Sequence, residues 1–307
     1  MQTTLKKSVT LAGVGLHSGR PTRVTLSPAA AEFGVWFRRT DAVDGDPLIP
    51  ARWDLVEQAP LCTRLVNADG VTVQTVEHIM AALAGCGIHN AMVEVSGPEV
   101  PVLDGSSAPF VEAILAAGVR RLDAPLRALR VLKPVTVGGT GGAEASLVPA
   151  DSLSIAFEID FDDAAIGHQA RRLDMANGAF VRELCDSRTF CRRADVEQMR
   201  KAGLALGGSL RNAVVVEGAD VLTPGGMRHA DEPVRHKMLD ALGDLALAGG
   251  PILGAYRGLR AGHALTNSLL RALFTEPGAV AWVTCDETML RRLPGMGVSL
   301  ADLPAVA

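Results

Sequence analysis

The chain has 307 residues, of which 48% are hydrophobic, 21% charged and only 4% aromatic, and its 34 acidic and 30 basic residues give a net charge of −4. This length fits one large domain or two of about 150 residues, and the composition excludes intrinsic disorder. Duplex-binding proteins carry a basic excess and single-strand binders use aromatic stacking, so we expect no nucleic-acid partner.

The sequence also gives expectations about compartment and membrane. The apolar stretch near the N-terminus is too short for a signal peptide, and no uncharged apolar run approaches about 18 residues. The five cysteines form no CxxC pair, which indicates a reducing compartment rather than a disulfide framework. We therefore expect a cytoplasmic protein without a transmembrane segment, and we take it to be a monomer.

Strands and helices are predicted in both halves of the chain. Alternating apolar residues predict strands, and apolar residues at three- and four-residue spacing predict helices. In the first half these patterns give strands at 8–16, 23–26, 34–38 and 91–95, and helices at 76–84 and 108–117. In the second half they give strands at 130–137, 144–148, 154–160, 213–216 and 251–256, and helices at 178–185, 195–202, 233–248 and 264–273.

A charged segment at 120–130 contains a proline, lacks periodicity and separates the two halves. Because each half combines strands with helices, we predict an α+β fold of two similar domains, 1–125 and 126–307, possibly related by duplication.

The helix at 233–248 carries the first chemical signal. His236 and Asp240 are four residues apart, so they lie on one helix face. With His78, at the start of the helix at 76–84, they form the set of three ligands typical of catalytic zinc. Glu77 is placed to take a proton from a water molecule whose pKa such an ion lowers to about 7. On spacing alone, an exposed ion pair or hydrogen bond is the commoner explanation of His236 and Asp240.

Two further residues bear on this interpretation. Asp244 lies one turn beyond Asp240, and two carboxylates on one stripe repel each other unless a cation lies between them, which favours a metal. His263 precedes the helix at 264–273, and its ordinary pKa near 6.5 suits proton donation. On the sequence pattern alone, a structural loop histidine is the commoner explanation of His263. Iron(II) could occupy the same ligands as zinc.

Six segments in chain order resemble one family. They are TVEHIMAALAGCGIHNAMVEV at 75–95, PVLDGSSAPF at 101–110, SRTF at 187–190, LALGGS at 204–209, VRHKMLDALGDL at 234–245 and GHALTN at 262–267, and LAGVGLHSG at 11–19 is similar too. The chain thereby resembles the UDP-3-O-acyl-N-acetylglucosamine deacetylases, the zinc amidases of lipid A biosynthesis. The resemblance implies hydrolysis of the acetamide of a UDP-linked acylated N-acetylglucosamine, in two domains that are each a mainly antiparallel sheet layered with helices as a βααβ sandwich.

The resemblance also implies roles for particular residues. It implies Zn²⁺ at His78, His236 and Asp240, a general base at Glu77, and a general acid at His263 that Asp244 orients. The other implied site residues are Thr189 for polarising the amide carbonyl, Lys237 and Arg260 for the phosphates, Asp160 and Phe161 for the uracil, and His17 near the same cleft.

The segment at about 191–222 is predicted to be an inserted strand–helix–strand, which in the family walls an acyl-chain passage. The glycine-rich loop at 138–144 lacks a basic residue that family members often carry there. Two other functions stay open: a silent protein that binds the same molecule without cutting it, and a zinc amidohydrolase acting on a different N-acetyl sugar. The ligands, base and acid argue against the first of these, and the apolar insert argues against the second.

Overall fold

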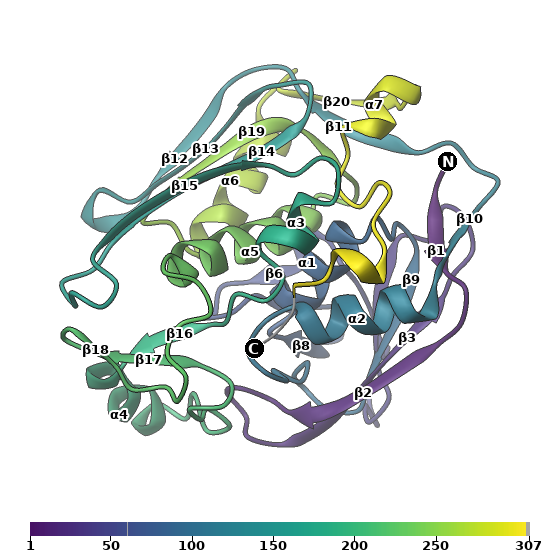
Figure 1. Ribbon diagram of the computed structural model, residues 1–307. Coiled ribbons are helices and arrows are strands. Elements are labelled where there is room, and N and C mark those ends of the chain that lie inside the picture. Colours follow the sequence, from purple (N-terminus) through teal and green to yellow (C-terminus); the bar gives the residue numbers. More distant parts are fainter. Residues whose placement is uncertain (60, 305–307) are drawn as a thin grey trace.

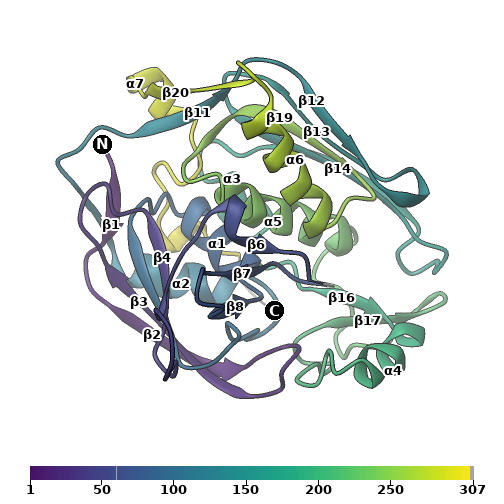
Figure 2. The same cartoon turned by 180° about the vertical axis from the view of Figure 1, so that it is seen from behind.

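The computed structural model describes residues 1–59 and 61–304 and shows helices packed among several sheets (Figure 1). The predicted α+β fold is confirmed in this mixed architecture. Helices α1, α5 and α6 lie between the two largest sheets, one built from each half of the chain (Figures 1 and 2). None of the described helices has the length and apolar character needed to cross a bilayer.

The sheet of the first half contains five strands. In spatial order these are β2 (Val9–Val14), β3 (Pro21–Pro28), β9 (Ala91–Val95), β4 (Val35–Arg39) and β5 (Leu48–Pro50). The central pair β9 and β4 is parallel, whereas the other neighbours are antiparallel. Helix α1 (Glu77–Gly85) precedes β9 in the chain, and α2 (Ala108–Ala117) follows it.

The sheet of the second half repeats this arrangement. Its corresponding strands are β12 (Val135–Gly138), β13 (Glu144–Pro149), β19 (Ile252–Leu259), β14 (Leu153–Asp160) and β15 (His168–Asp174). Here too the central pair, β19 with β14, is parallel and the other neighbours are antiparallel. Helix α5 (Glu232–Ala246) precedes β19, and α6 (His263–Thr275) follows it. Strands β11 (Arg127–Val131) and β20 (Val280–Thr284) extend this sheet beside the start of β19.

Each half adds a small three-stranded sheet before its central helix, α1 in the first half and α5 in the second. The first half adds β6 (Val56–Glu57), β7 (Arg64–Val66) and β8 (Thr72–Gln74). The second half adds α3 (Ala179–Glu183), β16 (Phe190–Arg192), α4 (Arg193–Lys201), β17 (Val214–Glu217) and β18 (Asp220–Val221). Strands β16 and β17 are parallel with α4 between them, so the predicted strand–helix–strand is present. It projects from the body of the molecule (Figure 1).

The two halves meet along helices α1 and α5, which lie side by side at the centre of the molecule. Their closest approach is at Gly243, where an added Cβ atom would overlap the backbone carbonyl of Glu77. Buried apolar residues from both halves form one continuous cluster around this pair. Close packing of this kind leaves little room for either helix to shift.

One sequence prediction at the junction was wrong. The strand expected at 130–137 is two strands, β11 and β12, because the ring of Pro134 interrupts the ladder and removes an N–H donor. The segment at 120–130, expected to contain the domain boundary, begins in β10 (Val119–Arg121), which pairs with β1 (Thr3–Leu5). The N-terminus and the end of the first half are therefore held together. The last α-helix of the described residues is α7 (Glu287–Arg291).

Candidate metal centre and active site

Three predicted ligands from α1 and α5 meet in the interior. His78, His236 and Asp240 are each at most 5% exposed, and one ligand atom from each lies within 4.8 Å of the others. The Nε2 atoms of His78 and His236 are 3.6 and 3.4 Å from Oδ1 of Asp240. The two imidazole rings are edge-on to one another, with centroids 5.0 Å apart. The i,i+4 pair on α5 therefore faces the first turn of α1, as its spacing requires.

The protonation of His236 is fixed by the backbone. Its Nδ1 atom donates a hydrogen bond of 3.0 Å to the carbonyl oxygen of Ser187, which leaves the lone pair of Nε2 directed at the cluster. Burial lowers the pKa of this imidazole to about 4, so the ring is neutral near pH 7. A neutral imidazole with a free Nε2 lone pair is the form that binds a metal ion.

Asp240 supplies a carboxylate that suits the same ion. Burial by itself opposes its ionisation, but the neighbouring His236 and the Lys237 ammonium hold its pKa well below the ordinary value. Its Oδ1 atom is buried and has no hydrogen-bond partner among the described residues. A buried oxygen anion without a donor is costly unless a cation binds it. The donor set of two imidazoles and one carboxylate, with this unpaired oxygen, therefore fits a divalent metal ion.

Beside the three ligands lies a second group of titratable side chains. His263, the first residue of α6, donates from Nδ1 to Oδ2 of Asp244 at 2.8 Å. Its Nε2 atom is 3.9 Å from Oε1 of Glu77 and 3.9 Å from Oδ2 of Asp240. A carboxylate from one half of the chain and an imidazole from the other thus face the same space.

The pKa values of Glu77 and His263 are both raised. Burial raises the pKa of Glu77 above its usual range, although the neighbouring histidines oppose this effect. Burial alone would lower the pKa of His263, but the Asp244, Glu77 and Asp240 carboxylates outweigh it and raise the pKa to about 9. His263 is therefore protonated at neutral pH. Perturbed titratable groups that face one space are typical of proton-transfer sites.

Thr63, in the loop between β6 and β7, connects Glu77 with Asp244, and sequence reasoning missed it. Its backbone N–H donates to Oε2 of Glu77 at 3.0 Å, and its hydroxyl donates to Oδ1 of Asp244 at 2.5 Å. No spacing signal could reveal it, because Thr63 and Asp244 are 181 residues apart in the chain.

A buried ion pair holds the segment that contains Thr189. The guanidinium of Arg188 donates to both carboxylate oxygens of Glu232, at the first turn of α5, over 2.9 and 3.1 Å. The backbone N–H of Thr189 donates to the carbonyl oxygen of Gly105 at 2.8 Å, and its side chain is half-buried. The next ring, that of Phe190, lies 6.4 Å from the His236 ring centroid. The predicted carbonyl-polarising residue is therefore next in the chain to a side chain that packs on a ligand.

Two more predicted residues lie at the edge of the cluster. The Lys237 ammonium is 3.0 Å from Oδ2 of Asp240, so in this structure it pairs with a ligand. His17 is 3% exposed, and burial lowers its pKa, with the charge of His263 acting in the same direction. The structure thus brings both residues beside the candidate metal centre.

Asp160 and Arg260 do not belong to the buried cluster. Asp160 is the exposed last residue of β14, and Arg260 directly follows β19, the neighbouring parallel strand. The Arg260 backbone N–H donates to the Glu158 carbonyl at 2.8 Å, and its guanidinium reaches the Gly141 carbonyl at 3.5 Å. Arg260 therefore lies at the glycine-rich loop that lacks a basic residue of its own.

Phe161 connects this exposed edge with the cluster. Its ring packs edge-on against Phe190 with centroids 5.5 Å apart, and Phe190 packs in the same manner against His236. A row of three rings thus runs from the end of β14 to the candidate metal centre. This row joins Phe161, which is predicted to bind the uracil, to His236, which is a predicted metal ligand.

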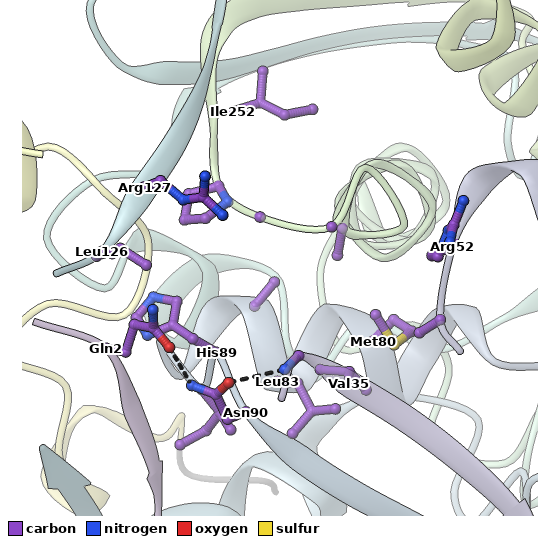
Figure 3. Close-up of a pocket in the computed structure, with 18 of the residues that line it drawn as sticks. Gln2, Val35, Arg52, Met80, Leu83, His89, Asn90, Leu126, Arg127 and Ile252 are labelled. Carbon is purple, nitrogen blue, oxygen red and sulfur yellow. Dashed lines mark hydrogen bonds between the residues drawn. The ribbon is translucent and has the colours of Figure 1, made fainter. Parts of the chain in front are cut away.

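A separate cavity of about 340 Å³ is lined by α1 and α5 as well (Figure 3). Its walls include Met80 and Leu83 of α1, with Leu242 and Leu245 of α5. At one end Asn90 donates to the side chain of Gln2 and accepts from a backbone N–H, so its amide group is satisfied there. The two helices thus turn titratable side chains to the metal centre and apolar ones to this cavity.

Comparison with known proteins gives a consistent result. Residues 2–275 match the family model LpxC, described as UDP-3-O-acyl N-acetylglycosamine deacetylase. Three similar proteins, each named UDP-3-O-acyl-N-acetylglucosamine deacetylase, come from Phenylobacterium zucineum, Anaeromyxobacter sp. and Idiomarina loihiensis. They are 49%, 47% and 46% identical to the chain, and the alignments cover 91%, 95% and 93% of it. The same alignments cover 94%, 95% and 94% of the relatives.

Proposed function

Because the chain belongs to the UDP-3-O-acyl N-acetylglycosamine deacetylase family, we propose that it hydrolyses the acetamide of UDP-3-O-(3-hydroxyacyl)-N-acetylglucosamine. The products are UDP-3-O-acyl-glucosamine and acetate, at the committed step of lipid A biosynthesis. The observation that carries this proposal is the buried group of two histidines and an aspartate beside Glu77 and His263. Metal-assisted amide hydrolysis uses these parts: a Lewis acid, a base for water and an acid for the leaving nitrogen.

The proposed metal ion is Zn²⁺ held by His78, His236 and Asp240, with Fe²⁺ as the alternative at the same ligands. When bound, such an ion supplies Lewis acidity, which lowers the pKa of water and polarises a carbonyl group. Ser187 supports this role by fixing the tautomer of His236. Lys237 neutralises part of the charge on Asp240.

Glu77 is the proposed general base. Its raised pKa brings the carboxylate closer to the pKa of the proton that it must take from water, which makes the transfer easier. Its second oxygen is held by the Thr63 N–H, so the first oxygen stays directed toward His263 and the space between them. The carboxylate is thereby oriented before substrate arrives.

His263 is the proposed general acid. Amide cleavage fails unless the leaving nitrogen receives a proton, and a protonated imidazole with a pKa of about 9 carries one at neutral pH. Asp244 accepts the Nδ1–H, so the proton on Nε2 points toward the reacting group. The Thr189 hydroxyl is proposed to donate to the amide oxygen as negative charge develops on it.

The remaining contacts concern the nucleotide and the fold. We assign the phosphates to Lys237 and Arg260, the uracil to Asp160 and Phe161, and a position near the same cleft to His17. The two halves are proposed to be related βααβ sandwich domains, 1–125 and 126–307, which their matching strand directions support. The cytoplasmic location and the monomeric state stay predictions.

The test is acetate release from the UDP-linked acylated sugar by the wild-type protein, the chelated protein and His236→Ala. We expect activity to fall more than about 10³-fold without the metal, because its Lewis acidity supplies several kcal/mol. His89→Ala is the control, since it removes another buried histidine outside the ligand set and should leave the bound metal in place. Full activity after complete metal removal contradicts the proposal, and binding of metal and substrate without acetate release identifies the silent binding protein instead.

A further inference from the structure

Glu99 is a buried carboxylate that none of the assigned roles uses. It lies between β9 and α2 and is 1% exposed. Its Oε1 atom accepts the backbone N–H of His17 at 2.8 Å and the hydroxyl of Thr75 at 2.9 Å, and its Oε2 atom accepts the backbone N–H of Ser18 at 2.8 Å. Three donors from two distant segments thus converge on one ion, and hydrogen bonds to a buried charge are stronger than ordinary ones.

One of these segments, which contains Thr75, leads directly into helix α1. Thr75 is two residues before Glu77 and has a φ of +58°, a left-handed conformation that is rare for a β-branched residue. The Gln74 N–H donates to the Pro98 carbonyl at 3.0 Å, and the Gln74 carbonyl accepts from the Val100 N–H at 3.1 Å. The backbone on both sides of Glu99 is therefore hydrogen-bonded to Gln74, the residue before Thr75. The carboxylate therefore holds Thr75 in the strained conformation that starts α1.

The other segment is the turn between β2 and β3. An added Cβ atom at Gly15 would overlap the Glu99 carboxylate, so the turn closes around the ion itself. The turn then receives the loop of the inserted segment: the N–H groups of Leu206 and Gly207 donate to the carbonyls of His17 and Leu16 at 3.2 and 3.0 Å. These contacts join backbone to backbone, so a shift of the turn carries the loop with it.

The 204–208 loop contacts His17 and presents an apolar side chain to solvent. The Ala205 N–H donates to Nδ1 of His17 at 3.4 Å, and Leu206 is 53% exposed. His17 is close enough to His263 for the charge of one ring to affect the pKa of the other. Leu206 therefore offers an apolar contact to an acyl chain near these two histidines.

We propose that Glu99 is a positioning residue that sets acyl-chain selectivity by fixing His17 and the 204–208 loop relative to the start of α1. This inference rests on the proposed function. The Glu99 carboxylate acts by position. It fixes the His17 turn, the 204–208 loop and the start of α1 relative to one another, so that the apolar contacts of the loop lie at a defined distance from Glu77 and His78.

The experiment compares Glu99→Gln with wild type on two substrates that differ only in the length of the 3-O-acyl chain. Glutamine keeps the shape but replaces one accepting oxygen with an NH₂ donor that faces a backbone N–H. We expect the ratio of kcat/KM for the long chain to that for the short chain to fall about tenfold, the scale of one lost charge-assisted hydrogen bond. The loss should appear in KM for the long chain, with kcat for the short chain and the metal content unchanged.

Three further variants make the result specific. Thr75→Val removes one donor without touching the carboxylate and should lower the ratio less, whereas Thr75→Ser should restore it. Glu94→Gln is the matched control, because Glu94 lies within β9, five residues before Glu99, and pairs with Arg38 instead. If Glu99→Gln does not fold, Thr75→Val decides the question in its place.

Two outcomes overturn the proposal. One is an unchanged ratio in a folded Glu99→Gln protein, which shows that the loop does not depend on the ion. The other is an equal fall of kcat on both substrates with loss of metal, which shows a general structural role. Failure of the proposed function is seen separately, because the wild-type protein would then cleave neither substrate.

Discussion

The two halves of the molecule share one strand order but contribute differently to the site. In each half a helix precedes a central strand of the main sheet, and these helices, α1 and α5, pack against each other. The first half supplies Glu77 and His78 from the first turn of its helix. The second half supplies two ligands from the middle of α5, with Asp244 one turn further and His263 at the start of α6.

The proposed site depends on both halves of the chain. Neither half alone holds the complete candidate ligand set or both proposed proton carriers, so the proposed chemistry is possible only where the halves meet. The exposed residues assigned to the nucleotide lie on the second half alone, at the ends of β14 and β19. Substitutions at the meeting of the halves should therefore change the rate, and those at the exposed edge should change substrate affinity.

The largest effect is expected for the base contributed by the first half. Glu77→Gln keeps the size of the side chain but removes the proton acceptor, so kcat should fall about 10²- to 10⁴-fold. The metal content should stay near that of wild type, because Glu77 is outside the ligand set. Steady-state kinetics with metal analysis measure both. Glu112→Gln, an exposed change on α2, is the control, and a kcat within a few-fold of wild type in Glu77→Gln would falsify the assignment of the base.

An intermediate effect is expected for the partner of the acid in the second half. The proposed mechanism requires protonated His263, so activity should be present below the pKa of about 9 and lost as the pH rises through it. Asp244→Asn removes the largest of the causes that raise this pKa, so the alkaline limb of kcat/KM should move to lower pH. The rate at neutral pH should fall about 10- to 100-fold, the scale of one hydrogen bond to a charged group. An alkaline limb that does not move would exclude Asp244 as the partner that sets it.

The smallest effect is expected at the exposed edge. Phe161→Ala removes the first ring of the row that leads to His236, and KM should rise about 3- to 10-fold with kcat nearly unchanged. Phe33→Ala is the control, since that ring is 37% exposed on the first half and far from the row. A fall in kcat instead of a rise in KM would show that Phe161 affects the reaction step. It would contradict the expectation that residues at the exposed edge affect substrate affinity alone.

The sequence predicted the parts of the site that depend on local spacing. The helices α1, α2, α5 and α6 follow from apolar periodicity, and His236 with Asp240 follows from the four-residue repeat of α5. That His78 joins them follows from no spacing; it was expected because catalytic zinc takes three ligands from histidine and carboxylate side chains, and the resemblance implies the same set. The strand β15 was missed because its residues alternate between exposed and half-exposed and carry several charges, so no apolar pattern marks it.

Contacts between distant segments were beyond the sequence for a physical reason. Thr63, Arg188 and Glu99 hold the site through hydrogen bonds to partners 14 to 181 residues away. Such contacts are decided by how the two halves dock, and single residues leave no periodic trace. The outward position of Asp160 and Arg260, by contrast, follows from the register of β14 with β19 once the sheet is known.

Gly243 limits which first and second halves can be combined in one protein. No side chain fits between α5 and the Glu77 carbonyl. The close packing of α5 on the start of α1, where Glu77 lies, therefore depends on glycine at position 243. A chimera that joins the first half of one relative to the second half of another would function only if glycine occupies this position and α1 presents the same backbone to it. The two halves, although alike in strand order, must therefore change together at this point.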